Sequence, residues 1–73
     1  MASKKDVHTV HNGDMWSNKV NGEVVSNHRT KEKAVEVGRD IAKSNHSEHK
    51  IHRMDGVISQ ANSYGNDPKK SKG

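Results

Sequence analysis

One segment of the chain repeats its apolar residues with the period of a helix. In the segment from Thr30 to Asn45, five small or apolar residues fall at i, i+1, i+4, i+7 and i+8, and they are Ala34, Val35, Gly38, Ile41 and Ala42. This spacing gathers them on one face, while charged residues fill the remainder. The pattern predicts a single amphipathic helix over residues 30–45 whose apolar face packs against other elements.

Segments rich in β-branched residues flank this helix and are separated by turn dipeptides. Three segments precede it, at residues 7–11, 15–20 and 23–28, and two follow it, at residues 49–54 and 57–62. The dipeptides are Asn12-Gly13, Asn21-Gly22 and Asp55-Gly56, which favour tight hairpin turns. We therefore predict an α+β fold with the element order β-β-β-α-β-β. Its antiparallel sheet has four to five strands, with one helix packed on one face.

The ends of the predicted helix and its glycine suggest how it packs. Thr30 suits the N-cap, and Asn45 can adopt the left-handed conformation that ends a helix. A glycine inside a helix costs about 1 kcal/mol relative to alanine. Gly38 lies on the apolar face, so we expect close approach to the sheet at this residue, against Trp16. Trp16, Gly38 and Ile41 are the predicted structural residues, with Trp16 filling the centre of a chain that has no Phe.

Length and composition limit the chain to one domain. It has 73 residues, of which 27% are hydrophobic, and it has no Cys, so disulfides are excluded. We expect a flexible lead at residues 1–5, a single α+β domain at residues 6–68 and a flexible basic tail at residues 69–73. No segment approaches the roughly 20 apolar residues of a membrane helix, so we expect a cytoplasmic protein.

The residue types that carry catalysis or bind metal do not form a recognisable motif. The chain has no Cys nucleophile, no Gly-x-Ser-x-Gly elbow and no glycine-rich phosphate loop, so we predict neither an enzyme nor a cofactor. A zinc site built from His11, His28, His52 and a carboxylate would need tertiary contacts to gather it. His49 and His52 would point to opposite faces of one strand. We therefore predict no metal site.

Several short motifs, taken in order, resemble one known family. They are Gly13-Asp14-Met15-Trp16, His28-Arg29-Thr30-Lys31-Glu32-Lys33-Ala34, Gly38-Arg39, Asp55-Gly56 and Ser63-Tyr64-Gly65-Asn66-Asp67-Pro68. Their order is similar to that of a small bacterial family known as domain of unknown function twenty-one eighty-eight, from about residue 7 to residue 73. That family usually has an apolar residue where this chain has Asn18, and Leu or Val in the strand that here contains Lys50. The resemblance implies a compact fold and supplies no active site.

These observations favour a small binding module over an enzyme. A sheet with one uncovered face and exposed edge strands is suited to a protein partner or to a second copy of the chain, giving a homodimer. The alternative is nucleic-acid binding of low specificity through the open sheet face, because that face could present several basic residues. The net charge of +4 adds little to this alternative, since it lies largely in the terminal lysines. The candidate binding residues are Lys19, Arg29, Lys50, Arg53 and Tyr64.

Overall fold

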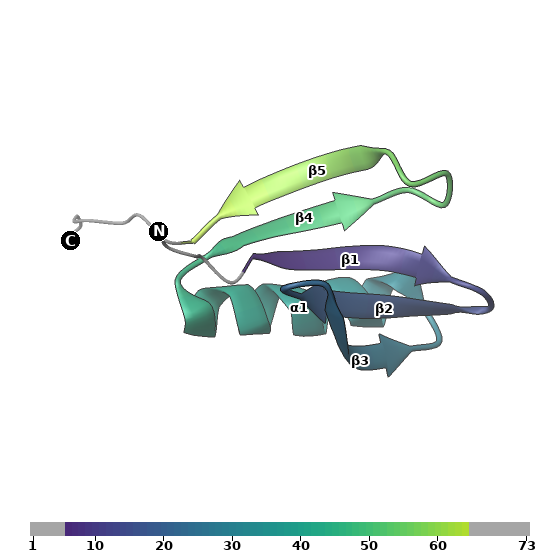
Figure 1. Ribbon diagram of the computed structural model, residues 1–73, viewed down its shortest axis with the longest axis horizontal. Helices are drawn as coiled ribbons and strands as arrows, with labels where there is room; N and C mark the ends of the chain where they lie inside the picture. Colours follow the sequence, from purple (N-terminus) through teal and green to yellow (C-terminus); the bar gives the residue numbers. More distant parts are fainter. Residues whose placement is uncertain (1–5, 65–73) are drawn as a thin grey trace.

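The turn dipeptides organise the first half of the domain, which is shown in Figure 1. The computed structural model describes residues 6–64. Strands β1 (Val7–Asn12), β2 (Met15–Val20) and β3 (Glu23–His28) form an antiparallel meander. Asn21 and Gly22 have φ angles of 57° and 81°, the left-handed pair that a type I′ turn requires. The first turn lies one residue later than predicted, at Gly13 and Asp14, because Asn12 pairs with Met15.

The helix carries the chain back across one face of the meander. Helix α1 (Lys31–Asn45) is followed by β4 (Glu48–His52) and β5 (Ile58–Ser63), and the strand order is β3-β2-β1-β4-β5. The order of elements and the α+β class are therefore as predicted. The prediction of a purely antiparallel sheet is wrong, because β4 lies beside β1 and runs parallel to it. The direction of α1 is opposite to that of β3, so the helix returns the chain to the end of the sheet where β1 begins. Strand β4 therefore starts at that end and runs in the same direction as β1.

Both ends of α1 have identifiable caps. The Thr30 side chain accepts a hydrogen bond from the Lys33 backbone N–H at 3.2 Å, as an N-cap should. The left-handed residue at the other end is His46, with a φ of 53°, and not the predicted Asn45. The N–H of His46 donates to the carbonyl of Lys43. The helix therefore ends where the left-handed turn redirects the chain into β4.

The layer between α1 and the sheet consists of small and polar side chains. The buried apolar residues are Val7, Ala34, Ala42 and Ile51. Thr9, Asn18 and His49 are equally buried beside them. Trp16 and Ile41 are only half-buried, so the expectation that Trp16 fills the centre is wrong. The small residues of α1 bring the helix so close to the sheet that an indole does not fit between them.

The described residues cover most of the predicted domain. The predicted lead at residues 1–5, the predicted tail at residues 69–73 and the turn at residues 65–68 lie outside them. Within residues 6–64, no helix is long and apolar enough to span a membrane.

Candidate functional site

A directional chain of hydrogen bonds crosses the buried layer. The Thr9 hydroxyl donates to Asn18 Oδ1 at 2.6 Å, and Thr9 Oγ1 lies 2.7 Å from His49 Nε2. Asn18 Nδ2 donates to the backbone carbonyl of Ala34 in α1 at 2.9 Å. Because the single Thr9 proton goes to Asn18, the Nε2 atom of His49 must carry a proton and donate to Thr9. The network therefore fixes both the tautomer of His49 and the position of the helix over the sheet.

Gly38 allows the helix to approach this network. A Cβ atom at position 38 would lie 2.6 Å from Asn18 Oδ1, 2.6 Å from His49 Nε2 and 2.9 Å from Thr9 Oγ1. The close approach that the sequence predicted at Gly38 is confirmed, but its partners are polar side chains and not Trp16. Asn18, which replaces the apolar residue usual in the resembling family, is one of these partners. The polar substitution is therefore accommodated by hydrogen bonds.

The buried histidine makes stability depend on pH. Burial lowers the pKa of His49 from its usual value of 6.5, and the positive charge of Arg39 and the neighbouring His8 lower it further. Below about pH 6.5, His49 is therefore protonated more readily in the unfolded chain than in the folded chain. By linkage, the free energy of unfolding should fall as the pH decreases below about 6.5. We expect the urea midpoint to be flat above about pH 7 and to decrease towards about pH 5.

A pair of variants isolates the contribution of His49. His49→Gln retains an N–H donor for Thr9 but cannot titrate, so its urea midpoint should vary less with pH than that of the wild type. Part of the dependence should remain, because burial, His52 and Lys50 also lower the pKa of His8 against the opposing charge of Asp6. His46→Asn, at the exposed C-cap, should keep the wild-type dependence. An unchanged slope in His49→Gln would contradict this assignment.

The open face of the sheet carries a row of basic side chains. His8 pairs with Lys19 on β2 and with Lys50 on β4, so the three side chains lie next to one another on this face. His8 Nδ1 lies 2.9 Å from His52 Nε2. The Lys50 ammonium lies 3.5 Å from a Glu48 carboxylate oxygen and 4.0 Å from one of Asp6. The charge of Lys50 is therefore largely compensated within the domain.

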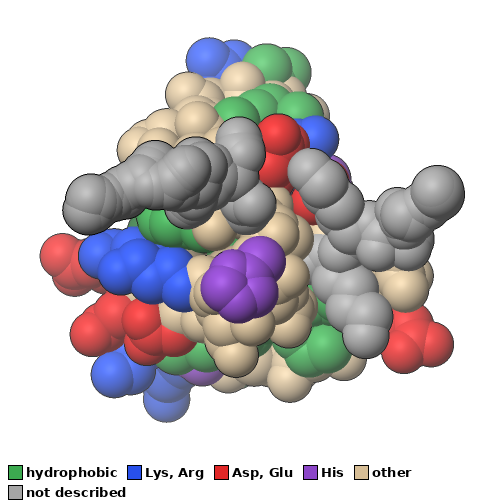
Figure 2. Space-filling model, turned by 90° about the vertical axis from the view of Figure 1, so that its left-hand side faces the viewer, with side chains coloured by type: hydrophobic (Ala, Val, Ile, Leu, Met, Phe, Trp, Pro, Cys, Tyr) green, Lys and Arg blue, Asp and Glu red, His purple; other side chains and the backbone are tan. Residues whose placement is uncertain are grey.

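The other candidate binding residues lie elsewhere. Arg29 follows β3 and borders a depression with Asp14 and Met15. Arg53 lies in the turn between β4 and β5 and forms an ion pair with Asp55 at 2.7 Å. Together with Lys19 and Lys50, these arginines do not form one basic surface. Figure 2 shows blue and red side chains close together at the end of the molecule where α1 ends, and not a uniformly basic patch.

Tyr64 closes the domain at that same end. Its backbone N–H donates to the carbonyl of Ser47 at 3.0 Å, and its ring lies 5.8 Å from the Lys43 ammonium. Tyr64 is half-buried. Within the described residues, it therefore has contacts that hold the end of β5 next to the end of α1.

Three features of the surface were not identified from the sequence. Strand β5 is a sheet edge that α1 does not contact. The turn before it exposes Met54 and Val57, and β5 begins with the exposed Ile58; their accessible fractions are 70%, 52% and 47%. Trp16 borders a pocket with Lys31 and the β4–β5 turn. The only sequence signal was the lack of charge in residues 57–64, between the Asp55-Gly56 turn and the C-terminal segment.

Metal binding receives no geometric support in the described part of the chain. Among residues 6–64, no three His, Asp or Glu side chains are arranged to hold a metal ion. His49 faces α1 while His52 faces the open side of the sheet, as the strand alternation predicted.

The fold and its surfaces define a class: residues 6–64 form a small α+β domain with one helix on a mixed five-stranded sheet, one edge strand of which α1 does not contact. The chain belongs to the family described as uncharacterized protein conserved in bacteria, DUF2188, whose match extends over residues 7–64. The match ends at Tyr64, so the predicted motif beyond that residue lies outside it. The curated proteins and solved structures compared with the chain give no match.

Proposed function

We propose that this protein is a non-enzymatic, cytoplasmic binding module that associates with a second copy of itself through the edge of β5. The observation that carries the proposal is the exposure of this strand and its lack of charged residues. Strand β5 is a six-residue edge strand, Ile58–Ser63, without a single charged residue, and no element within residues 6–64 covers it. Natural edge strands usually carry charges or a covering element that prevent pairing with another chain. The absence of both here favours pairing as a function.

The register of β5 presents free backbone groups to a partner. The Tyr64 N–H donates to Ser47, one step beyond the pairing of Glu48 with Ser63. In an antiparallel ladder, hydrogen-bonded and non-hydrogen-bonded pairs alternate. The N–H and C=O groups of Ser63 and Ala61 therefore point away from β4 towards the free edge. A second β5 strand that approaches around a two-fold axis can accept and donate hydrogen bonds there.

The opposite edge of the sheet is less suited to this role. Strand β3 begins with the charged residue Glu23 and packs against α1. Register irregularities occur beside both edges, between Asn18 and Lys19 next to β3 and between Ile51 and His52 next to β5, so they do not distinguish the two edges. Nucleic-acid binding through the open face receives less support than self-association, since Lys50 is paired with Glu48 and Asp6.

Two matched substitutions to glutamate test the choice of edge. Ala61 lies opposite Lys50, so Ala61→Glu places a carboxylate beside an ammonium within one copy. In the dimer, however, the two introduced carboxylates would approach each other across the axis. We expect wild-type protein at micromolar concentration to sediment with twice its monomer mass of 8.1 kDa, and Ala61→Glu to sediment as the monomer.

The control is Val25→Glu on the exposed edge strand β3, which should remain a dimer. Circular dichroism should show that both variants are folded. A wild-type protein that sediments only as the monomer would refute self-association. Loss of the dimer in Val25→Glu alone would assign the interface to β3.

A further inference from the structure

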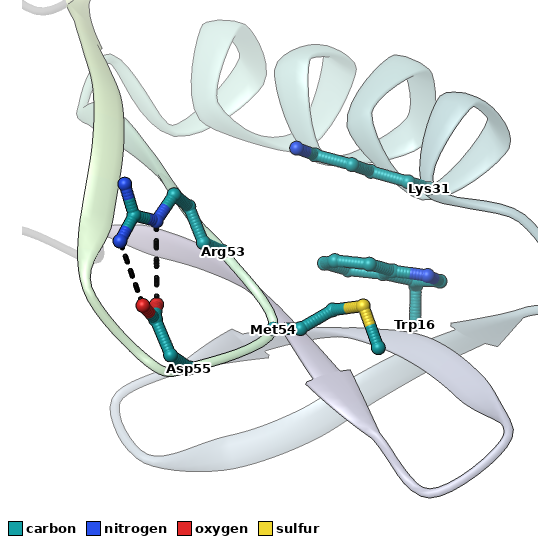
Figure 3. Close-up of a pocket in the computed structure, with 5 residues that line it drawn as sticks. All are labelled: Trp16, Lys31, Arg53, Met54 and Asp55. Atoms are coloured by element: carbon teal, nitrogen blue, oxygen red, sulfur yellow. Dashed lines mark hydrogen bonds and ion pairs between the residues drawn. The ribbon is translucent and has the colours of Figure 1, made fainter.

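A second surface lies apart from the β5 edge, at the other end of α1. A pocket of about 460 Å³ opens between the first residue of the helix, Lys31, the β2 residue Trp16 and the β4–β5 turn. Arg53, Met54 and Asp55 form the wall that the turn contributes, as Figure 3 shows. This volume lies within the range of about 300–1,000 Å³ that is typical of ligand sites.

The apolar part of the pocket consists of the side chains that the core does not use. Trp16 is the only tryptophan of the chain, and it is half-buried at this surface. His11 holds the indole edge to face at a ring distance of 4.9 Å. Met54, the most exposed large apolar residue within residues 6–64, reaches the same pocket from the turn. Tryptophan and methionine are enriched at the centres of protein interfaces, and methionine adapts its shape to different partners.

The polar rim of the pocket favours a negatively charged ligand. Lys31 and Arg53 are positive and Asp55 is the only negative residue of the lining. Asp55 is bound by Arg53, whereas the Lys31 ammonium has no carboxylate partner within residues 6–64 and lies 5.5 Å from the Trp16 ring centroid. An acidic group that enters the pocket would therefore find Lys31 available for an ion pair.

The arrangement around the indole distinguishes between two kinds of acidic ligand. Figure 3 shows Lys31 on one side of the Trp16 ring and Met54 on the other. Within residues 6–64, the lining offers one ammonium without a carboxylate partner, that of Lys31, whereas sites for single-stranded nucleic acids combine aromatic platforms with a positively charged groove that follows the backbone. Trp16 and the exposed Met54 supply the apolar contacts for a side chain that enters the pocket.

We infer that this pocket binds an acidic peptide segment by taking up one of its apolar side chains. Trp16 and Met54 contact the apolar side chain, and Lys31 pairs with a neighbouring carboxylate of the peptide. The site is separate from β5, so binding does not require self-association. Hot spots of peptide recognition commonly combine such a desolvated apolar anchor with charged groups at the rim.

The fluorescence of Trp16 provides a direct assay with the full chain. The probes are blocked pentapeptides of the pattern Glu-Asp-x-Asp-Glu, in which x is Leu, Met or Phe. We expect at least one of them to change the Trp16 emission saturably. The same peptide with Gly at x should bind about tenfold more weakly. A peptide with Lys in place of every acidic residue should not bind.

Variants locate the binding. Lys31→Glu and Met54→Ala alter exposed side chains, so both should fold, and each should weaken binding about tenfold. Lys33→Glu, two residues further along α1 and therefore on another side of the helix from Lys31, is the matched charge control and should bind like the wild type. Ala61→Glu should also bind, which separates this inference from the proposed dimer.

Three results would overturn the inference. One is the absence of any saturable change with all three apolar peptides up to about 1 mM. Another is an equal loss of affinity in Lys33→Glu and Lys31→Glu, which would indicate unspecific attraction between charges. The third is a Trp16 response to oligothymidine that exceeds the response to the peptides, because this result would assign the pocket to nucleic acid.

Discussion

Replacing Gly38 by alanine should destabilise the domain, although alanine is the better helix former. The gain in helix propensity is about 1 kcal/mol. Against it, the new Cβ atom would lie within 2.6–2.9 Å of Asn18 Oδ1, His49 Nε2 and Thr9 Oγ1. Overpacking typically costs about 1–3 kcal/mol, and here it also distorts buried hydrogen bonds. We expect a net loss of about 2 kcal/mol in the free energy of unfolding, measured by urea denaturation.

Gly38→Leu should leave the chain unfolded. A domain of this size rarely has more than about 3–5 kcal/mol of stability, and a leucine side chain cannot be placed without separating α1 from the sheet. The control is Glu36→Lys on the exposed side of the same helix, which should keep the wild-type urea midpoint. A folded Gly38→Leu variant with a wild-type midpoint would show that the helix can move away from the sheet at little cost.

Replacing the Thr9 hydroxyl should have the second large effect. Thr9→Val conserves the shape of the side chain but leaves Asn18 Oδ1 and the Nε2–H group of His49 without their partner. Each buried polar group without a partner costs about 1–3 kcal/mol. We therefore expect Thr9→Val to lose about 2–4 kcal/mol in the free energy of unfolding.

Thr9→Ser is the matched control, because it removes a methyl group and keeps the hydroxyl. Its loss should be smaller, on the order of the 0.8 kcal/mol of one buried carbon. Thermal and urea denaturation of both variants at pH 7.5, where His49 is neutral, would measure the difference. If Thr9→Val is as stable as Thr9→Ser, the hydrogen bonds across the core contribute little to stability.

Both experiments concern a core held together by hydrogen bonds and close contact. A domain with few large apolar residues gains little from area burial alone. In this domain, the buried residues of the helix are no larger than alanine. The sheet fills the remaining space of the buried layer with Thr9, Asn18 and His49. Trp16 is therefore left at the surface, where it lines the pocket near Lys31 and its fluorescence can report binding there.

The candidate site was only partly predictable. The alternation of β2 and β4 places Lys19 and Lys50 on the open face, as the sequence suggested. Arg53 was selected for its charge, but its position beside Met54 and Trp16 depends on three elements that are distant in sequence. The exposed edge of β5 depends on the strand order, which hydrophobic periodicity does not determine.

The sequence by itself determined the features that depend on local backbone preferences. Asn21-Gly22 specified the second hairpin, Thr30 capped the helix, and the spacing of Ala34, Gly38 and Ala42 specified the face that packs against the sheet. These features follow from dihedral angles and periodicity within a few residues.

Only the tertiary structure decided how these elements meet. The parallel pairing of β1 with β4 depends on the length and direction of the crossover through α1. The burial of Asn18 and His49 in place of Trp16 depends on the distance between the helix and the sheet. The pattern of apolar residues does not determine this distance. Gly38 illustrates both points. The sequence shows that a glycine interrupts the apolar face of the helix, and the structure shows the three polar side chains that lie against it.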